Sequence, residues 1–171
     1  MNKKICAAFL ALWGILSLSA CAATKAPAEN AAVPAETAAP TEATKYTNAE
    51  GMQIKVTAGD VEVTVTLNGS KAAADLVNML PLELTLIERN RFAKGMTLPA
   101  PLSAEEKTTR QYEIGDFGYW DAGPDLAIFY DDIYEQTVVP VIPLGKAESG
   151  AEKLANTSGT VTLELVEDGT A

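Results

Sequence analysis

The chain has 171 residues, with 13 lysines and arginines against 23 aspartates and glutamates, which gives a net charge of −10. A strongly acidic surface repels a phosphate backbone, and this argues against nucleic-acid binding. The sequence has no histidine, which excludes Ser-His-Asp catalysis, Cys-His catalysis and imidazole metal ligands. Both cysteines, Cys6 and Cys21, precede the predicted folded part, so no disulfide is expected inside it.

The N-terminus has the pattern of an export signal. Lys3 and Lys4 give it a basic start, and residues 5–18 are mostly apolar. This apolar stretch is shorter than the ~20 residues that a permanent membrane-spanning helix needs, and its length is typical of the central region of a signal peptide. We therefore predict that residues 1–20 are a signal peptide.

The signal ends in Leu18-Ser19-Ala20-Cys21, which resembles the lipobox of bacterial lipoproteins. The resemblance implies cleavage after Ala20 and acylation of Cys21 with chains such as palmitate. Two or more acyl chains hold a protein stably on a membrane, so we expect a lipid-anchored protein of the cell envelope with its domain on the extracytoplasmic side. The alternative is an ordinary cleaved signal that a cysteine follows by chance.

Residues 21–45 form a predicted tether between the anchor and the domain. After Cys21 they are mostly Ala, Pro, Glu, Thr and Lys, without an aromatic residue. This composition buries too little apolar surface to offset the entropy of ordering, and Pro27, Pro34 and Pro40 interrupt a helix. We predict a disordered tether; the alternative is an alanine-rich helix.

The predicted folded domain covers residues 46–171, which is long enough for one hydrophobic core. Its first elements show the alternation of apolar and polar residues that is typical of half-buried strands. Residues 52–56 and 61–65 are expected to form a hairpin around a turn at residues 58–60.

A helix follows the hairpin in the prediction. Ser70 is suited to cap it, and Pro81 ends it. Residues 82–87 are the next predicted strand. Residues 89–111 are polar and irregular and are expected to form one long loop, which in a compact domain is usually functional or mobile.

The last part of the domain alternates strands and turns again. Strands are predicted at residues 117–120, 126–130, 138–142 and 160–166. Residues 149–152 have the spacing of a capping box, which predicts a short helix before the last strand. Many strands with two short helices predict a mainly β fold, a closed β-barrel with helical caps.

Four pieces of the domain, in this order and spacing, resemble the bacterial cyclophilin-like domain family. The resemblance implies a closed barrel of roughly eight strands with two capping helices, and it covers nearly all of residues 52–166. The pieces are Asn68-Gly69-Ser70 with Met79-Leu80-Pro81-Leu82, then GDFGYW at residues 115–120, LAIFY at 126–130 and IPLGK at 142–146.

The resemblance does not carry the activity of cyclophilins with it. True cyclophilins bind and isomerise proline with an arginine in a Phe-His-Arg segment, which a Phe-Met-x-Gln segment follows. The corresponding strand here, residues 82–88, contains neither histidine nor arginine. Arg89 and Arg91 come just after it and are the candidate catalytic residues; the catalytic residues themselves stay unknown.

Four aromatic residues are candidates for a ligand pocket. Tyr119, Trp120, Phe129 and Tyr130 flank Gly-Pro turns, and such positions at a barrel rim suit a peptide or a small ligand. The alternative is core packing, because alternating strand residues fill small barrels. Trp120 and Tyr130, each at a strand end, are the preferred pocket members.

Charged clusters offer a second set of candidates. Arg89, Arg91 and Lys94 could bind a carboxylate or supply a counterpart of the cyclophilin arginine; the alternative is a solvated turn. A group of four aspartates lacks the spacing of an EF-hand loop, and turn chemistry explains them better. We therefore predict no metal site and no cofactor. The aspartates are Asp121, Asp125, Asp131 and Asp132.

Together these features predict a membrane-anchored extracytoplasmic lipoprotein whose cyclophilin-like domain binds a peptide or a small ligand without strong catalysis. The first alternative is a peptidyl-prolyl cis-trans isomerase that acts on exported proteins. The second is an accessory domain for a redox partner, because relatives of this family occur beside flavodoxin-like domains.

Overall fold

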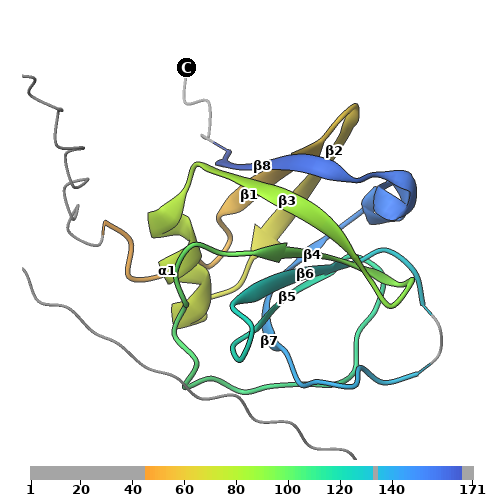
Figure 1. Cartoon of the computed structure of the whole chain (residues 1–171). Coiled ribbons are helices and arrows are strands. Elements are labelled where there is room, and N and C mark those ends of the chain that lie inside the picture. Colours follow the sequence, from red (N-terminus) through yellow and green to blue (C-terminus); the bar gives the residue numbers. More distant parts are fainter. Residues whose placement is uncertain (1–44, 133–134, 167–171) are drawn as a thin grey trace, which may run out of the picture. The chain divides into compact units, whose positions relative to one another are not determined.

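The computed structural model describes residues 45–132 and 135–166. This part of the chain contains eight β-strands, one α-helix and one 3-10 helix (Figure 1). The strands are β1 (Gln53–Ala58), β2 (Val61–Leu67), β3 (Leu82–Arg89), β4 (Ala93–Thr97), β5 (Asp116–Trp120), β6 (Asp125–Phe129), β7 (Ile142–Ala147) and β8 (Gly159–Leu165). The helices are α1 (Lys71–Met79) and the 3-10 helix η1 (Ala151–Asn156).

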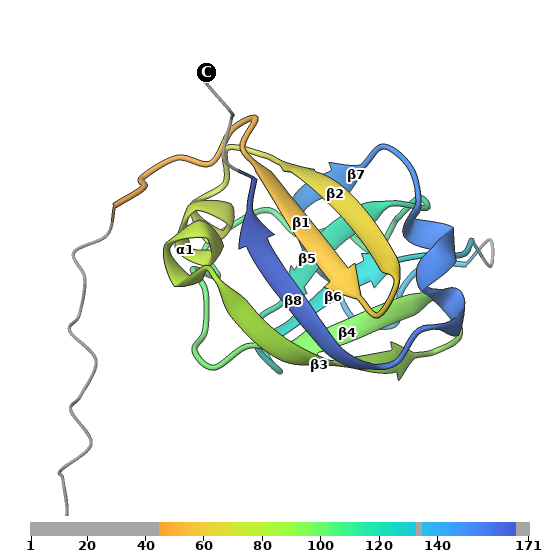
Figure 2. The same ribbon diagram turned by 90° about the horizontal axis from the view of Figure 1, so that it is seen from above.

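The strands close into a barrel in the order β1-β2-β7-β5-β6-β4-β3-β8 (Figure 2). Every neighbouring pair is antiparallel, and β8 completes the circle between β1 and β3. Closure pairs both edges of each strand, so no edge is left to template aggregation. The predicted fold class, a closed and mainly β barrel of about eight strands with two short helices, is confirmed.

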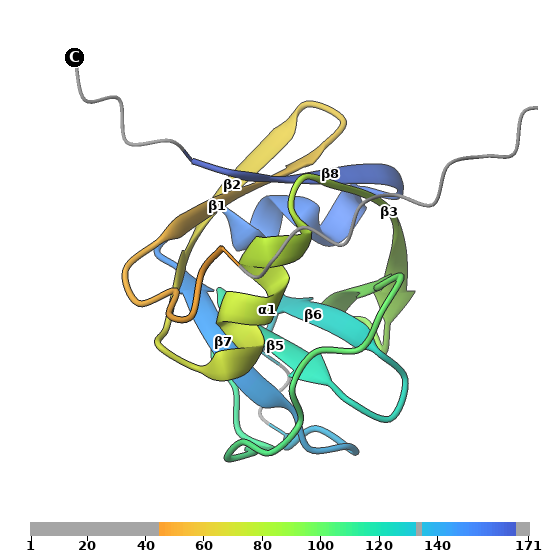
Figure 3. The same cartoon turned by 90° about the vertical axis from the view of Figure 1, so that its left-hand side faces the viewer.

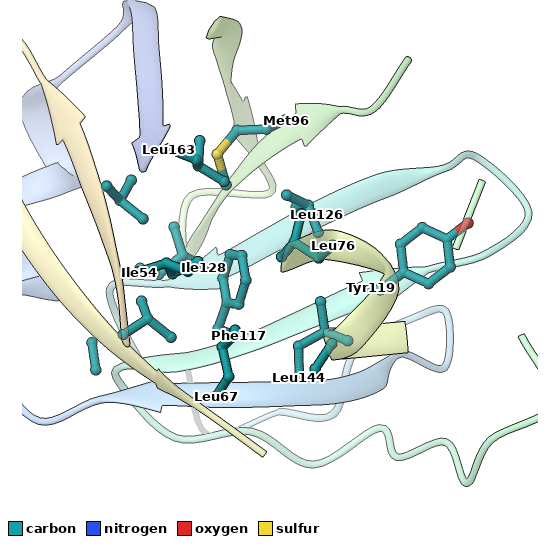
Figure 4. Close-up of a cluster of buried hydrophobic side chains, with 14 of the residues drawn as sticks. Ile54, Leu67, Leu76, Met96, Phe117, Tyr119, Leu126, Ile128, Leu144 and Leu163 are labelled. Atoms are coloured by element: carbon teal, nitrogen blue, oxygen red, sulfur yellow. The ribbon is translucent and has the colours of Figure 1, made fainter. Parts of the chain in front are cut away.

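The interior of the barrel is the hydrophobic core. In β2, Val63, Val65 and Leu67 are buried, and the residues between them lie toward the outside. The interior of an eight-stranded barrel is just wide enough for side chains to fill it. Here the filling side chains come from strands all around the barrel. Figure 4 shows how they meet; it labels Ile54, Leu67, Leu76, Met96, Phe117, Tyr119, Leu126, Ile128, Leu144 and Leu163.

The helix α1 covers one end of the barrel (Figure 3). It begins as predicted, because the Ser70 hydroxyl oxygen accepts a hydrogen bond from the backbone N–H of Ala73 at 3.1 Å. It ends before Pro81, with the backbone N–H of Leu80 bonded to the Val77 carbonyl. The face that α1 turns to the core consists of Ala72, Ala73, Ala74, Leu76 and Val77.

The second helix, η1, lies at the opposite end of the barrel from α1 (Figures 1 and 2). The capping box predicted for it is wrong. The residue before the helix is Gly150, in a left-handed conformation with φ 88°, and it makes no side-chain cap. A short 3-10 helix of six residues results, held by the burial of Ala151 and Leu154 rather than by a side-chain cap at its N-terminus.

The prediction of one long loop at residues 89–111 is wrong in its first part. Arg89 still belongs to β3, and β4 follows after a tight turn in which Asn90 and Arg91 have positive φ angles of 55° and 66°. Ala93 to Thr97 contain Lys and Gly, which locally favour a turn over a strand. Pairing with β3 on one side and β6 on the other stabilises β4 against that local preference.

The strand predicted at residues 138–142 is also displaced. The observed β7 begins at Ile142 and runs through Pro143 to Ala147. Pro143 lies at an irregularity in the pairing of β7 with β5, where the register shifts between Phe117 and Gly118. A proline is tolerated at such a point, and this explains why the pattern alone ended the strand too early.

The chain enters the described part beside α1. The amide oxygen of Asn78 accepts hydrogen bonds from the backbone N–H groups of Lys45 and Tyr46, both at 2.9 Å, and its nitrogen donates to the Tyr46 carbonyl. The predicted signal peptide, Cys21 and all of the predicted tether before Lys45 lie outside the described residues. Within the described ranges, no helix combines the length and the apolar character needed to cross a membrane.

Candidate functional site

A second apolar cluster lies on the outside of the barrel, across the neighbouring strands β4, β6 and β5. Residues directly opposite each other in antiparallel strands share one face of the sheet. Ala93 of β4 is paired with Phe129 of β6, and both belong to a cluster that is separate from the interior core. The outer face of these three strands therefore carries an apolar cluster, which Phe92 and Val141 complete from outside the strands.

The middle row of this outer face carries only small side chains. Gly95 is paired with Ala127, and Ala127 is paired with Gly118 on its other side. Because these side chains are small, the surface of the sheet is low at this row. We call the row of Gly95, Ala127 and Gly118 the floor of the site. Beside it, the rings of Tyr112 and Phe129 stack with their centroids 4.4 Å apart, and Phe92 stacks on Tyr112 at 5.1 Å.

One wall of the site is a ribbon outside the barrel. Thr109 and Val141 exchange two backbone hydrogen bonds of 2.8 and 2.9 Å, and the backbone N–H of Thr137 donates to the Arg110 carbonyl at 2.9 Å. The buried Thr137 hydroxyl also donates to the Val139 carbonyl at 2.7 Å. These bonds fix the wall although it has no regular secondary structure of its own.

Floor and wall enclose a groove of about 440 Å³. Phe129, Phe92 and Val141 form its buried apolar side, and Val138, with 79% of its surface exposed, lies at its open side. The groove is mostly apolar, with charge confined to one place. Its complete lining is Arg89, Asn90, Phe92, Ala93, Trp120, Asp125, Leu126, Ala127, Phe129, Thr137, Val138, Val139 and Val141.

Arg89 provides the charged end of the groove. Its side chain leaves β3, crosses Gly95 of β4 and donates from Nη2 to Oδ2 of Asp125 on β6, at 2.5 Å. A Cβ on Gly95 would lie 2.7 Å from Nε of Arg89, so only glycine lets the arginine lie flat there. Asp125 is almost completely buried, and its other oxygen accepts from the Thr97 hydroxyl at 2.5 Å.

Trp120 lines the groove from the end of β5. It is paired with Asp125 across β5 and β6, which places Arg89 and Trp120 in the same groove. The indole ring lies against Gly123 in the following turn, where a Cβ would meet ring carbons at 2.2 Å. Gly123 thus makes room for the ring, and the ring remains partly exposed at the groove.

The structure separates the four aromatic candidates. Trp120 and Phe129 line the groove, Phe129 at its buried side. Tyr119 lies in the interior core instead, as Figure 4 shows, and its hydroxyl oxygen accepts from the backbone N–H of Leu102 at 3.1 Å. Tyr130 also packs with the interior cluster and does not line the groove.

Tyr130 belongs to a polar cluster behind the groove. Its hydroxyl donates to Oε1 of Glu88 at 2.8 Å, and Nζ of Lys94 donates to Oε2 of the same carboxylate at 2.7 Å. Only 4% of the Lys94 side chain is exposed, and its ammonium also lies 5.3 Å from the centre of the Tyr130 ring. Lys94 is therefore a paired interior residue, not part of a basic surface cluster with Arg89 and Arg91.

This cluster changes two pKa values. Burial raises the pKa of Tyr130 to about 12, together with its hydrogen bond to Glu88 and the negative charge of that carboxylate. Burial alone would raise the pKa of Glu88, but the hydrogen bonds from Lys94 and Tyr130 and the charge of Lys94 outweigh it, and the pKa is lowered. Glu88 is thus held ionised and Tyr130 is held neutral.

Arg91, the second arginine candidate, lies in the turn after β3 and does not line the groove. Of the four aspartates, Asp125 accepts hydrogen bonds from Arg89 and Thr97. No group of three metal-ligating side chains occurs in residues 45–132 or 135–166.

Sequence reasoning missed the small residues and the wall. Nothing in the local pattern distinguishes Gly95, Ala127 or Gly118 from ordinary strand or turn residues. Their common row exists only because β4, β6 and β5 are neighbours in the barrel. The exposed pair Val138-Val139, placed wrongly in a strand, was the available signal for an apolar surface.

The closed barrel with a helix at each end gives the fold class of the protein. The family model described as the Cyclophilin-like family matches residues 56–166. The chain therefore belongs to the cyclophilin-like family. A search of the curated proteins finds no match.

Two solved structures share this fold. One is the solution structure of a hypothetical protein from Archaeoglobus fulgidus, with 18% identity and a TM-score of 0.58; the match covers 70% of this chain and 97% of that one. The other is McbB in complex with tryptophan, with 15% identity and a TM-score of 0.53, and the match covers 70% of this chain but only 46% of McbB. At such identities the likeness concerns the fold alone.

Proposed function

We propose that the protein is a lipid-anchored extracytoplasmic lipoprotein whose cyclophilin-like domain binds a peptide or a small ligand in the outer groove. The observation that carries the binding part of the proposal is the groove, an apolar hollow of about 440 Å³ that Arg89 and Trp120 help to line. The anchor rests on the lipobox resemblance at residues 18–21. A few polar groups around an apolar pocket are the usual composition of a ligand site.

The energetics support binding of an apolar side chain. Burying one such side chain contributes roughly 1.5–3 kcal/mol, and the stacked rings and Val141 offer a dry surface for it. The wall is already fixed by backbone hydrogen bonds, so little further ordering is needed on binding. McbB, which shares the fold, is described with bound tryptophan, and this favours aromatic groups as the first probes.

The binding test uses the fluorescence of Trp120. The sequence has two tryptophans, so the full chain with Trp13→Phe retains Trp120 alone. We expect its emission to change saturably on titration with acetyl-Ala-Ala-Phe, as the acid or the amide. The Kd should be millimolar or lower, which corresponds to a binding free energy of about −4 kcal/mol or better. Ala127→Leu fills the floor and should abolish the change. Thr64→Leu, on the exposed side of β2, is the matched control. An unaltered emission with both probes would contradict the proposal.

The anchor is tested separately on the lipidated cysteine. Cells that express the chain are grown with a clickable palmitate analogue, and the label is followed on wild type and on Cys21→Ser. The lipobox resemblance predicts label on wild type only, with the variant retained as an unprocessed or mislocalised precursor. Equal labelling of both proteins would refute the anchor.

Prolyl isomerisation is the second candidate function, and one observation favours it: Arg89 lies in the same groove as Trp120. We rank it second because no Phe-Met-x-Gln segment accompanies Arg89, and the barrier of ~18–20 kcal/mol needs several preorganised donors. A protease-coupled assay on an Ala-Pro-Phe peptide should show at most a weak rate gain. A large gain that Arg89→Ala or Arg91→Ala removes would reverse this ranking.

A further inference from the structure

We propose that the groove recognises the C-terminal carboxylate of a peptide whose last residue is apolar. In this arrangement the carboxylate binds the guanidinium of Arg89 and the last side chain occupies the apolar floor. The inference rests on the proposed function and specifies its ligand. The added claim is that the ligand must carry a free carboxylate.

Arg89 keeps most of its hydrogen-bond donors available to a ligand. A guanidinium has five N–H donors in a rigid fork that matches a carboxylate. Among the described residues only Asp125 accepts from it, through Nη2 alone. The side chain is 42% exposed, so the remaining donors are accessible at the groove.

Asp125, in contrast, is not available to a ligand. Both of its oxygens are occupied, one by Arg89 and the other by Thr97, and only 8% of its side chain is exposed. A cationic ligand would find no open carboxylate at this end of the groove. An anionic ligand finds an arginine that is already oriented by Asp125, so the entropy of fixing that long side chain is largely lost before binding.

A glycine lies beneath the Arg89 side chain. Gly95 allows the arginine side chain to lie against β4, because a Cβ there would stand 2.7 Å from Nε and 2.9 Å from Cγ of Arg89. The Arg89 side chain therefore lies against β4 at the edge of the apolar floor. Charge and apolar floor are adjacent, as a terminal residue with a free carboxylate requires.

The shape of the groove favours a peptide over a free amino acid. Arg89, Ala127 and Val138 all line the hollow, and 79% of Val138 is exposed to solvent. The preceding residues of a chain can leave the groove there. The net charge of −10 opposes anions at long range, but physiological salt screens charges beyond ~8 Å and leaves the direct contact with Arg89 effective.

The test compares matched probes on the full chain with Trp13→Phe. The acid acetyl-Ala-Ala-Phe should bind at least about tenfold tighter than its amide, because a hydrogen bond to a charged group is worth more than one to a neutral group. Arg89→Gln should remove this preference. Gly95→Ala, which keeps every charge but displaces the arginine, should reduce it. Arg91→Gln, in the adjacent turn and outside the groove, should leave it unchanged.

The outcomes separate the two proposals. Equal binding of acid and amide to the unsubstituted groove overturns the carboxylate inference and leaves the groove as a ligand site. No binding of either probe overturns both. Acetyl-phenylalanine binding as tightly as the tripeptide acid overturns the assignment to a peptide. If Arg89→Gln unfolds, which a thermal melt shows, Gly95→Ala and Arg89→Lys decide, since a lysine keeps the charge but not the fork.

Discussion

Arg89 and Asp125 lie on strands that are not neighbours, yet their side chains meet at 2.5 Å above Gly95, which belongs to the strand between them. One arginine thus joins β3, β4 and β6 on the outer wall of the barrel. The same contact orients the only arginine of the groove and neutralises the carboxylate buried beneath it. The contact therefore stabilises the barrel wall and, in the proposed function, also positions the arginine that binds the ligand.

We expect Asp125→Asn to lower the free energy of unfolding by about 1–2 kcal/mol. The loss comes from the buried carboxylate that Arg89 and Thr97 bind, and it stays below that of a fully buried ion pair because Arg89 is half-exposed. Urea denaturation measures it. Asp121→Asn, on the exposed side of the neighbouring turn, is the control and should change little. Equal midpoints for Asp125→Asn and wild type would show that the pair does not contribute.

Tyr130 should be the tyrosine that titrates late. Its pKa is raised to about 12, so its phenol stays neutral at pH 11, where an ordinary tyrosine has ionised. Because this pKa lies above the unfolded value, its contribution to stability is complete below about pH 10 and is lost as the pH rises toward 12. Absorbance of tyrosinate at pH 11 measures it: Tyr130→Phe should give the same signal as wild type. A signal smaller by one tyrosine would contradict the assignment.

The lowered pKa of Glu88 predicts that the stability of the fold depends on pH in the acid range. Its pKa is lowered in the folded state, so the stabilisation is present above the unfolded value of about 4.3 and is lost as the pH falls through the lowered one. Wild type should be more stable than Glu88→Gln at pH 7, and the difference should shrink as the pH falls below the unfolded value of about 4.3. Thermal melts across this range give the comparison. A difference that grows toward acid pH would reverse the sign of the argument.

Asn78 should protect the start of the domain from proteolysis. Its side chain binds the backbone of Lys45 and Tyr46, next to the bond that trypsin would cut. We expect trypsin to cleave rapidly after Lys25 in wild type and in Asn78→Ala, but rapidly after Lys45 only in the variant. Asn156→Ala, at the other end of the barrel, is the control. Rapid cleavage after Lys45 in wild type would show that Asn78 does not hold this segment.

The barrel was predictable because its signals are local or periodic. Alternation identified the first hairpin, and Ser70 with Pro81 marked the ends of α1. β4 was not predictable in the same way. Its residues carry no strand pattern, and they form a strand only because barrel closure supplies partners on both sides. Tertiary pairing overrides propensity there.

The candidate site was predicted in part. Arg89 and Trp120 were singled out as residue types and do lie in one groove, together with Phe129. Tyr119 faces the interior, because strand alternation places it on the opposite face from its neighbour Trp120. The row of small residues and the wall at residues 137–141 depend on strand order and on a ribbon of nonlocal hydrogen bonds, which no local pattern encodes.

Chemical-shift mapping of the isotope-labelled full chain with acetyl-Ala-Ala-Phe is the most direct test of the outer groove as the ligand site. We expect shifts that gather at the Trp120 indole N–H, Ala127, Val139 and the Arg89 side chain, which line the groove from β5, β6, the segment at residues 137–141 and β3. Shifts confined to β1 and β8, on the opposite side of the barrel, or no shifts at millimolar peptide, would contradict it.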